Sequence, residues 1–142
     1  ATRVDQVGSI NNFIMASCVS RPEFIGFGTL HPDFPGLDDE LERIVAGGLL
    51  GIKLHPDFQA FTADDPRLDP VYELLSFRSL PVLIHAGDAR YDFSGPKRLA
   101  RVLDRHPRLV MIAAHFGGYT EWDDALDCLA GRELWFDTSS SL

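Results

Sequence analysis

Imidazole side chains follow four separate apolar runs of this sequence. His31 comes after FIGFGTL, His55 after GLLGIKL, His85 after PVLI and His115 after VMIAA. Side chains at the carboxyl ends of parallel strands converge on one rim of an α/β protein, so these histidines can meet around a metal ion or a substrate. The pattern predicts an enzyme site at that rim.

His85 and His115 are the strongest candidates, because each ends an apolar run and has a glycine two residues further on, which leaves room for a ligand beside the backbone. A neutral imidazole in such a place suits zinc or another borderline divalent metal. The alternative is a core histidine that only hydrogen-bonds to a neighbouring loop. Two such residues on successive runs favour the functional interpretation.

The alternation of side chains along a strand predicts which of these groups share a face. Lys53 is expected to point the same way as His55, and His115 the same way as Met111 and Ala113. A lone ammonium is costly to bury unless it meets a carboxylate or an anionic substrate. Lys53 is therefore a candidate substrate-binding residue.

Asp88 is a second candidate for binding a polar substrate group, or for orienting an imidazole, because it follows His85 by three residues. His31 and His55 each precede Pro-Asp, so we favour a structural role for both, at a turn that the aspartate shapes. His106 lies in DRHPR at an expected helix end, where a surface position near the helix dipole is the simplest interpretation.

Short apolar runs alternate with segments of helical periodicity over the whole chain, in the order αβαβαβαβαβ. Strands are expected at residues 24–30, 48–54, 80–87, 109–118 and 133–139. Five helices are expected. The first covers residues 3–16, the second runs from Leu37 to the glycines at 47–48, and the third follows an N-terminal cap formed by Asp69 and Pro70. The fourth begins at Pro96 and ends before Pro107, and the fifth follows a capping box that begins at Thr120. Strands this apolar belong to a parallel sheet covered by helices, in one domain over residues 1–142.

Composition excludes several classes of protein. The formal net charge is -8 and the isoelectric point is about 4.9, which argues against a surface for nucleic acid or anionic lipid and favours a small-molecule substrate. The chain has no apolar run near the roughly 20 residues that cross a bilayer. Cys18 and Cys128 have no disulfide or CxxC pattern, so we expect free thiols in a reducing, cytoplasmic compartment.

Taken together, GIKLHPDFQ, LPVLIHAGD, MIAAHFGG and WFDTSS resemble the amidohydrolase-related family of metal-dependent hydrolases and decarboxylases, which are (β/α)8 TIM barrels. The resemblance implies that His85 is a metal ligand and that His115 lies beside the metal and acts as a general acid or base. Lys53 matches the family's lysine and is kept as substrate-proximal. The implied cofactor is a divalent ion, most simply zinc.

The family's first H-x-H pair and its final aspartate are absent, so the chain corresponds to strands three to seven of a barrel that takes about 250 residues. We therefore expect a partial barrel, either an internal portion or the ordered part of a longer polypeptide. The expected activity is hydrolysis of small amides, lactones or carboxylic acids, little of it from this chain alone.

Three alternatives stay open. A decarboxylase of the same family would use the same metal, and a free-standing five-stranded α/β module would bind a ligand without catalysis. Missing strands would also leave unpaired edges, through which two copies of the chain can associate as a homo-oligomer.

Overall fold

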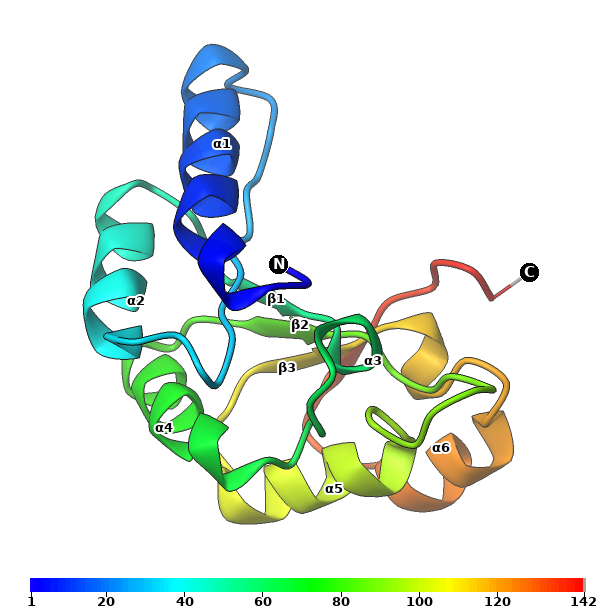
Figure 1. The fold of residues 1–142 in the computed structure, drawn as a ribbon. Coiled ribbons are helices and arrows are strands. Elements are labelled where there is room, and N and C mark those ends of the chain that lie inside the picture. The colour runs from blue at the N-terminus through cyan, green and yellow to red at the C-terminus, as the bar shows by residue number, and fades with distance from the viewer. Residues whose placement is uncertain (142) are drawn as a thin grey trace.

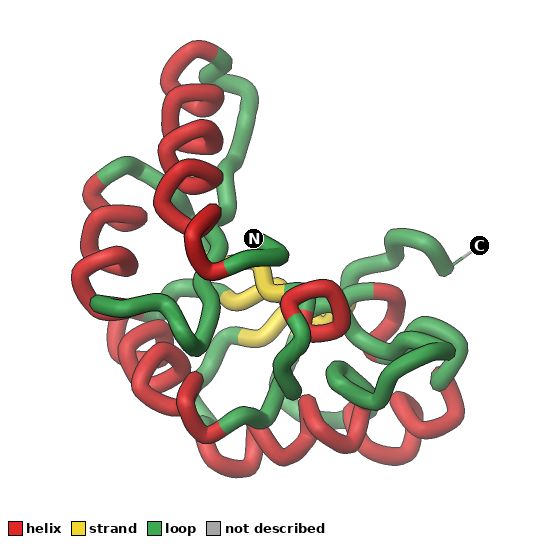
Figure 2. Tube along the Cα trace, in the orientation of Figure 1, coloured by secondary structure: helices red, strands yellow, loops and turns green. Residues whose placement is uncertain are grey.

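The computed structural model describes residues 1–141 and places a short parallel sheet at the centre of the molecule, with helices around it (Figures 1 and 2). The strands are β1 (Ile52–Leu54), β2 (Val82–Ile84), β3 (Met111–Ala113) and β4 (Trp135–Phe136). The α-helices are α1 (Val7–Ser20), α2 (Leu37–Ala46), α3 (Pro56–Gln59), α4 (Asp69–Arg78), α5 (Pro96–Arg105) and α6 (Trp122–Leu129). Three 3-10 turns span Val4–Gln6, Pro66–Leu68 and His115–Gly117.

All four strands are parallel and lie in the order β1-β2-β3-β4. Because a crossover joins each strand to the next, the carboxyl ends lie on one side, as the sequence predicted. One face is fully buried against the helices, through Ile52, Leu54, Val82, Ile84, Met111 and Ala113. On the opposite face, Lys53 of β1 lies beside Leu83 of β2, and Leu83 lies beside Ile112 of β3. All three side chains are partly exposed. This second face carries the histidine rim.

Helices α2, α4, α5 and α6 form an arc along one side of the sheet, and α1 projects away from it (Figure 1). In α5, Pro96 supplies the preset backbone angle of a first helical turn, and Leu99, Val102 and Leu103 are buried as their spacing predicts. In α2, three acidic residues occupy the first turn, where the helix dipole favours them, and Leu41 and Ile44 are buried. Local signals and burial therefore agree for both helices.

The strand expected at 24–30 is reduced to an isolated parallel bridge between Gly28 and Ile52. The side chain of Gln59 is the reason, because it takes the place of the next pair of ladder hydrogen bonds. The backbone N–H of His55 donates to Gln59 Oε1 at 2.7 Å, and Gln59 Nε2 donates to the Leu30 carbonyl at 2.8 Å. The His55 amide and the Leu30 carbonyl are therefore joined through Gln59 rather than to each other, and the five expected strands become four and a bridge.

Two expected helix caps are wrong. Asp69 is the first residue of α4, and its carboxylate binds Arg105 and His106 instead of the helix amides. Thr120 has φ +64°, and Glu121 takes the cap position of α6 without a side-chain hydrogen bond. His106 is buried rather than on the surface, because its Nε2 lies 2.8 Å from Asp69 Oδ1.

Within residues 1–141, none of the helices has the length and apolar character needed to cross a membrane.

Candidate functional site

Three histidine rings meet at the carboxyl ends of β1, β2 and β3. The His55 and His85 rings stack with centroids 3.8 Å apart at 16°, and the His85 and His115 rings meet edge to face at 4.8 Å and 73°. Since these residues are 30 positions apart in sequence, only the parallel register brings them together. The predicted convergence of His85 and His115 is confirmed, and His55 joins them.

His115 reaches this cluster by a route that strand alternation did not predict. Met111 and Ala113, its expected companions, are fully buried on the helix side of the sheet. After Ala114 the backbone turns left-handed, with φ +57° at His115 and +53° at Phe116, and this carries the imidazole to the opposite face. Two successive left-handed residues that are not glycine are strained, which is typical of functional sites.

Among the residues that the structure describes, three buried polar atoms beside the stacked rings have no hydrogen-bond partner. They are His55 Nδ1, Asp57 Oδ1 and His85 Nε2. Each belongs to a residue whose ligand atom lies within 4.8 Å of the other two. Buried polar atoms normally find partners, so an unpaired group of two imidazole nitrogens and one carboxylate oxygen fits a divalent metal ion. Ser94, fully buried, holds the other carboxylate oxygen of Asp57 through its hydroxyl.

Hydrogen bonds assign the free nitrogen of His85. The carbonyl of Ser139 can only accept, so His115 Nδ1, 2.7 Å away, is the donor. In neutral His115 the Nε2 lone pair then accepts from His85 Nδ1 at 3.0 Å. His85 therefore carries its proton on Nδ1 and presents a bare lone pair on Nε2. This is the tautomer that a metal ligand requires.

Burial also keeps the imidazoles of His55 and His85 neutral. It lowers the pKa of His85 to about 4, helped by the neighbouring His55. Burial likewise lowers the pKa of His55 to about 4, helped by the charge of Lys53. Both rings are uncharged at neutral pH, so their lone pairs are available to a cation.

Lys53 lies on the same strand face as His55, two residues before it in the chain. Burial lowers the pKa of its ammonium to about 8, although the charge of Asp137 acts in the opposite direction. Within residues 1–141 the ammonium makes no ion pair or hydrogen bond. A half-buried cation with no direct partner is available to an anionic substrate, so the predicted substrate role of Lys53 stays a prediction.

The cluster opens into a cavity of about 210 Å³. Its wall contains three histidines, two aromatic rings, an acid, a base and a serine: His55, Phe58, His85, Asp88, Arg90, His115, Tyr119 and Ser140. Asp88 lies here as predicted, but its carboxylate binds Arg90 at 2.8 and 2.9 Å rather than an imidazole. The hydrogen bonds from Arg90 lower the pKa of Asp88 to about 2.

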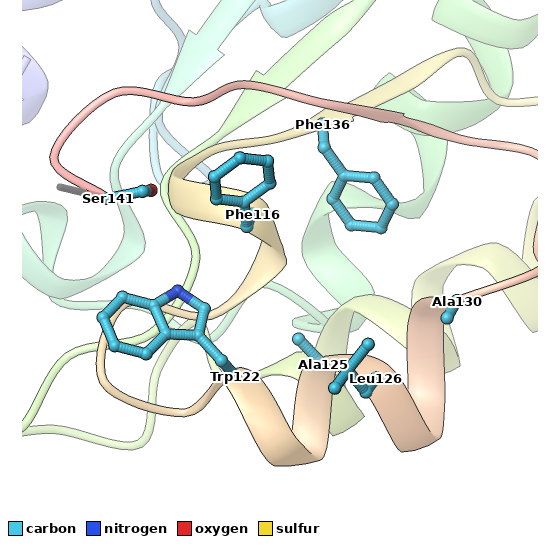
Figure 3. Close-up of a pocket in the computed structure, with 7 residues that line it drawn as sticks. All are labelled: Phe116, Trp122, Ala125, Leu126, Ala130, Phe136 and Ser141. Carbon is cyan, nitrogen blue, oxygen red and sulfur yellow. The ribbon is translucent and has the colours of Figure 1, made fainter.

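A second hollow, of about 370 Å³, lies between β4 and α6 (Figure 3). Its wall is almost wholly apolar: Phe116, Trp122, Ala125, Leu126, Ala130, Phe136 and Ser141. It is larger than the histidine cavity, but it offers no titratable group. We therefore place the chemistry in the histidine cavity and regard this hollow as uncovered apolar surface beside the last strand.

Sequence reasoning assigned His55 a structural role and did not consider Asp57 as a ligand. The signal was present, since Lys53 and His55 were expected on the same face and HPDF directly follows a strand. The same structural role was assigned to the histidine of the other HPDF copy, at residues 31–34, and there the assignment holds. There His31 is buried between the Gln59 carbonyl and the Asp33 amide, at 3.1 and 3.2 Å, which is the expected structural role.

Comparison with known proteins gives one family and several solved folds. Residues 4–141 match the family described as Amidohydrolase. An uncharacterised TIM-barrel protein from Bordetella bronchiseptica is 20% identical with a TM-score of 0.78, over 90% of this chain and 48% of its own. A 5-carboxyvanillate decarboxylase from Sphingomonas paucimobilis is 18% identical with a TM-score of 0.69, over 95% of this chain and 54% of its own.

A 5-carboxyvanillate decarboxylase from Novosphingobium aromaticivorans, solved with manganese and 4-hydroxy-3-methoxy-5-nitrobenzoic acid, is 23% identical. Its TM-score is 0.67, over 86% of this chain and 40% of its own. The chain thus spans about half the length of the solved structures that it matches. At these identities the similarity shows the fold, and the predicted partial TIM barrel is confirmed.

Proposed function

The chain belongs to the amidohydrolase family, and from this premise we propose that the whole protein is a metal-dependent hydrolase of small amides, lactones or carboxylic acids. The observation that carries the proposal is the buried group of unpaired ligand atoms on His55, Asp57 and His85. These side chains would hold the ion. Two imidazoles and one carboxylate are a common set for catalytic zinc, and manganese is the alternative because one structural neighbour contains it.

A divalent ion in this position supplies an activated water and polarises a substrate oxygen. Of the chain's own residues, His115 is the proton carrier. The Ser139 carbonyl keeps the proton of His115 on Nδ1, so Nε2 is the atom that takes a proton from water or substrate when it gives up its contact with His85. The charge of Lys53 acts on both His55 and His85, so its ammonium would balance negative charge that develops on the substrate.

Decarboxylation is the second candidate reaction. It is favoured by the two 5-carboxyvanillate decarboxylases whose folds match 86% and 95% of this chain. The same residues would then hold a carboxylic acid, and His115 would deliver a proton to the carbon that loses carbon dioxide. Assays of the whole protein distinguish the two reactions, because only the decarboxylase releases carbon dioxide.

Metal content after purification tests the proposal without reference to turnover. We expect about one zinc or manganese ion per chain, measured by mass spectrometry of the dissolved metal and by calorimetric titration. His85→Ala should lose the ion, whereas His106→Ala should keep it, since His106 is also buried but binds Asp69 away from the cluster. A wild-type protein that binds neither ion would be a non-catalytic binding module instead.

A further inference from the structure

Asp137 contacts the turn that carries His115 with both of its backbone groups. Its N–H donates to the Ala113 carbonyl at 3.0 Å, and its carbonyl accepts from the Phe116 N–H at 2.9 Å. In addition, the indole Nε1 of Trp122 donates to the His115 carbonyl at 3.1 Å. These hydrogen bonds hold the left-handed backbone of His115 in place. The rotation of its imidazole and the position of the ring proton are left to other contacts.

The side chain of Asp137 sets the conformation of Ser139. Its Oδ1 accepts from the Ser139 backbone N–H at 2.7 Å and also from the Ser139 hydroxyl. The hydrogen bond from that hydroxyl lowers the pKa of Asp137, so the carboxyl is ionised at neutral pH. An ionised carboxylate can only accept, and the hydroxyl proton of Ser139 is therefore directed at Asp137.

Ser139 in turn presents two acceptors to one nitrogen of His115. Its carbonyl lies 2.7 Å from His115 Nδ1 and its Oγ lies 3.1 Å from the same atom. Since the hydroxyl proton is used by Asp137, Oγ faces the imidazole with a lone pair. Nδ1 therefore carries the proton of the neutral ring and Nε2 keeps its lone pair. A protonated Nδ1 is no base, so His115 does not activate Ser139 as a nucleophile.

The same kind of turn occurs at two other aspartates and ends differently there. Asp65 accepts from the backbone N–H of Arg67 at 2.9 Å, and Asp88 accepts from that of Arg90 at 2.8 Å. In both turns the arginine Nε also donates to the same acid, at 3.0 and 2.9 Å. These two turns close on themselves as ion pairs. At Asp137 the residue two positions on is a serine, and its acceptors hold an imidazole instead.

We propose that Asp137 is a positioning residue, which through Ser139 holds the proton of His115 on Nδ1 and keeps Nε2 free to take a proton from water or substrate. The inference rests on the proposed function, in which His115 is the proton carrier, and it names the residue that sets the tautomer of that carrier. The hydrogen bond at one ring nitrogen decides the state of the other. A carrier held in this way has its proton on the correct nitrogen before the substrate binds.

Nitrogen-15 NMR of the metal-free protein, labelled at histidine, tests the assignment, because the protonated and the bare nitrogen of a neutral imidazole give well-separated signals. At about pH 8, where an ordinary imidazole is neutral, wild-type His115 should carry its proton on Nδ1. Asp137→Ala should mix the two tautomers, so that the two His115 signals move toward each other. Asp137→Asn should restore the wild-type positions, since its amide oxygen still accepts from Ser139. His115→Ala identifies the signals by removing them.

Two further variants serve as controls. Asp65→Ala removes the same kind of turn where no histidine depends on it, and it should leave the His115 signals unchanged. Ser139→Ala should also keep the proton on Nδ1, because the carbonyl acceptor remains and Asp137 still holds the backbone N–H. Thermal melting checks that each variant is folded, and Asp137→Ser replaces Asp137→Ala if the alanine variant does not fold.

A wild-type His115 with its proton on Nε2, or an Asp137→Ala spectrum equal to that of wild type, overturns the inference. Equal changes in Asp137→Ala and Asp137→Asn also overturn it, because the hydrogen bonds to Ser139 would then not be the cause. Zinc titration of the wild type is a separate measurement. A tautomer that depends on Asp137 in a protein that binds no zinc supports the inference while the metal proposal fails. A tautomer indifferent to Asp137 in a protein that binds zinc overturns the inference while the metal proposal stands.

Discussion

The Nε2 atom of His115 lies 3.0 Å from the Nδ1 atom of His85, between the ends of neighbouring strands. This contact links the two residues that the sequence singled out, and it decides which nitrogen of His85 is left for a ligand. The ring nitrogen of a metal-binding histidine that does not contact the metal usually donates its proton to a carboxylate or a carbonyl oxygen. Here a second imidazole has that place, and the Ser139 carbonyl orients it in turn.

Removal of this contact should weaken metal binding without removing a ligand. His115→Ala leaves His85 free to adopt either tautomer, and loss of such an outer partner typically costs about 10–100-fold in metal affinity. Calorimetric titration with zinc measures the change. An affinity equal to that of wild type would show that His115 does not orient His85, and His106→Ala controls for loss of a buried histidine elsewhere.

Gly87 should tolerate no side chain, because it lies against the loop that carries Tyr119. A Cβ at Gly87 would be 2.6 Å from the backbone N and O of Tyr119, and its φ is +78°. Gly131 is a matched control, since its φ is +82° and a Cβ there would meet nothing within 4 Å. We expect Gly131→Ala to cost about 1 kcal/mol from the left-handed backbone and Gly87→Ala about 2–4 kcal/mol from strain plus overlap. Urea unfolding measures both, and equal losses would contradict the predicted overlap.

Glu40 should contribute stability that disappears in acid. Burial alone would raise the pKa of Glu40, but hydrogen bonds from Arg43 and Asn11 offset it and hold the pKa below its usual value. A lowered folded-state pKa adds stability above the unfolded pKa, and this stability is lost as the pH falls through the folded one. Glu40→Gln should therefore cost about 1–2 kcal/mol at pH 7 and progressively less below about pH 4.

Chemical unfolding over a range of pH checks the prediction for Glu40. Glu42→Gln is the control on the same helix, because Glu42 makes an exposed ion pair with Arg78 and should change stability by no more than about 1 kcal/mol. A Glu40→Gln deficit that stays constant down to pH 3 would mean that the carboxylate charge is not its source.

The edge strand β4 should make the chain associate with a second copy. Trp135 is 70% exposed on that strand, and the apolar hollow of Figure 3 lies beside it. Exposed apolar edges of this kind promote pairing between chains. Trp135→Lys should shift light scattering toward the monomer, whereas Phe77→Lys, which changes an equally exposed residue on α4, should not. A monomeric wild type at high concentration would contradict the prediction.

Much of the architecture was predictable from local patterns. Apolar runs bounded by turns and helices with one apolar face are set by residues close in sequence, so α2, α5 and the parallel order of β1 to β3 follow from them. The position of His85 at a strand end was predictable for the same reason, because strand alternation holds along β2 up to that residue. Lys53 also lies where alternation predicts it.

Tertiary contacts decided the rest. Strand alternation fails at His115 because the backbone leaves the β region there, and no local pattern announces that left-handed turn. Gln59 ends the pairing of the expected first strand at Leu30 from 29 residues away, and Asp57 gains its place beside His85 through Ser94, 37 residues later. Such pairings depend on how crossovers pack onto the sheet. The sequence alone therefore determined which residues stand at the rim, and only the folded chain decided which of their atoms are left unpaired for chemistry.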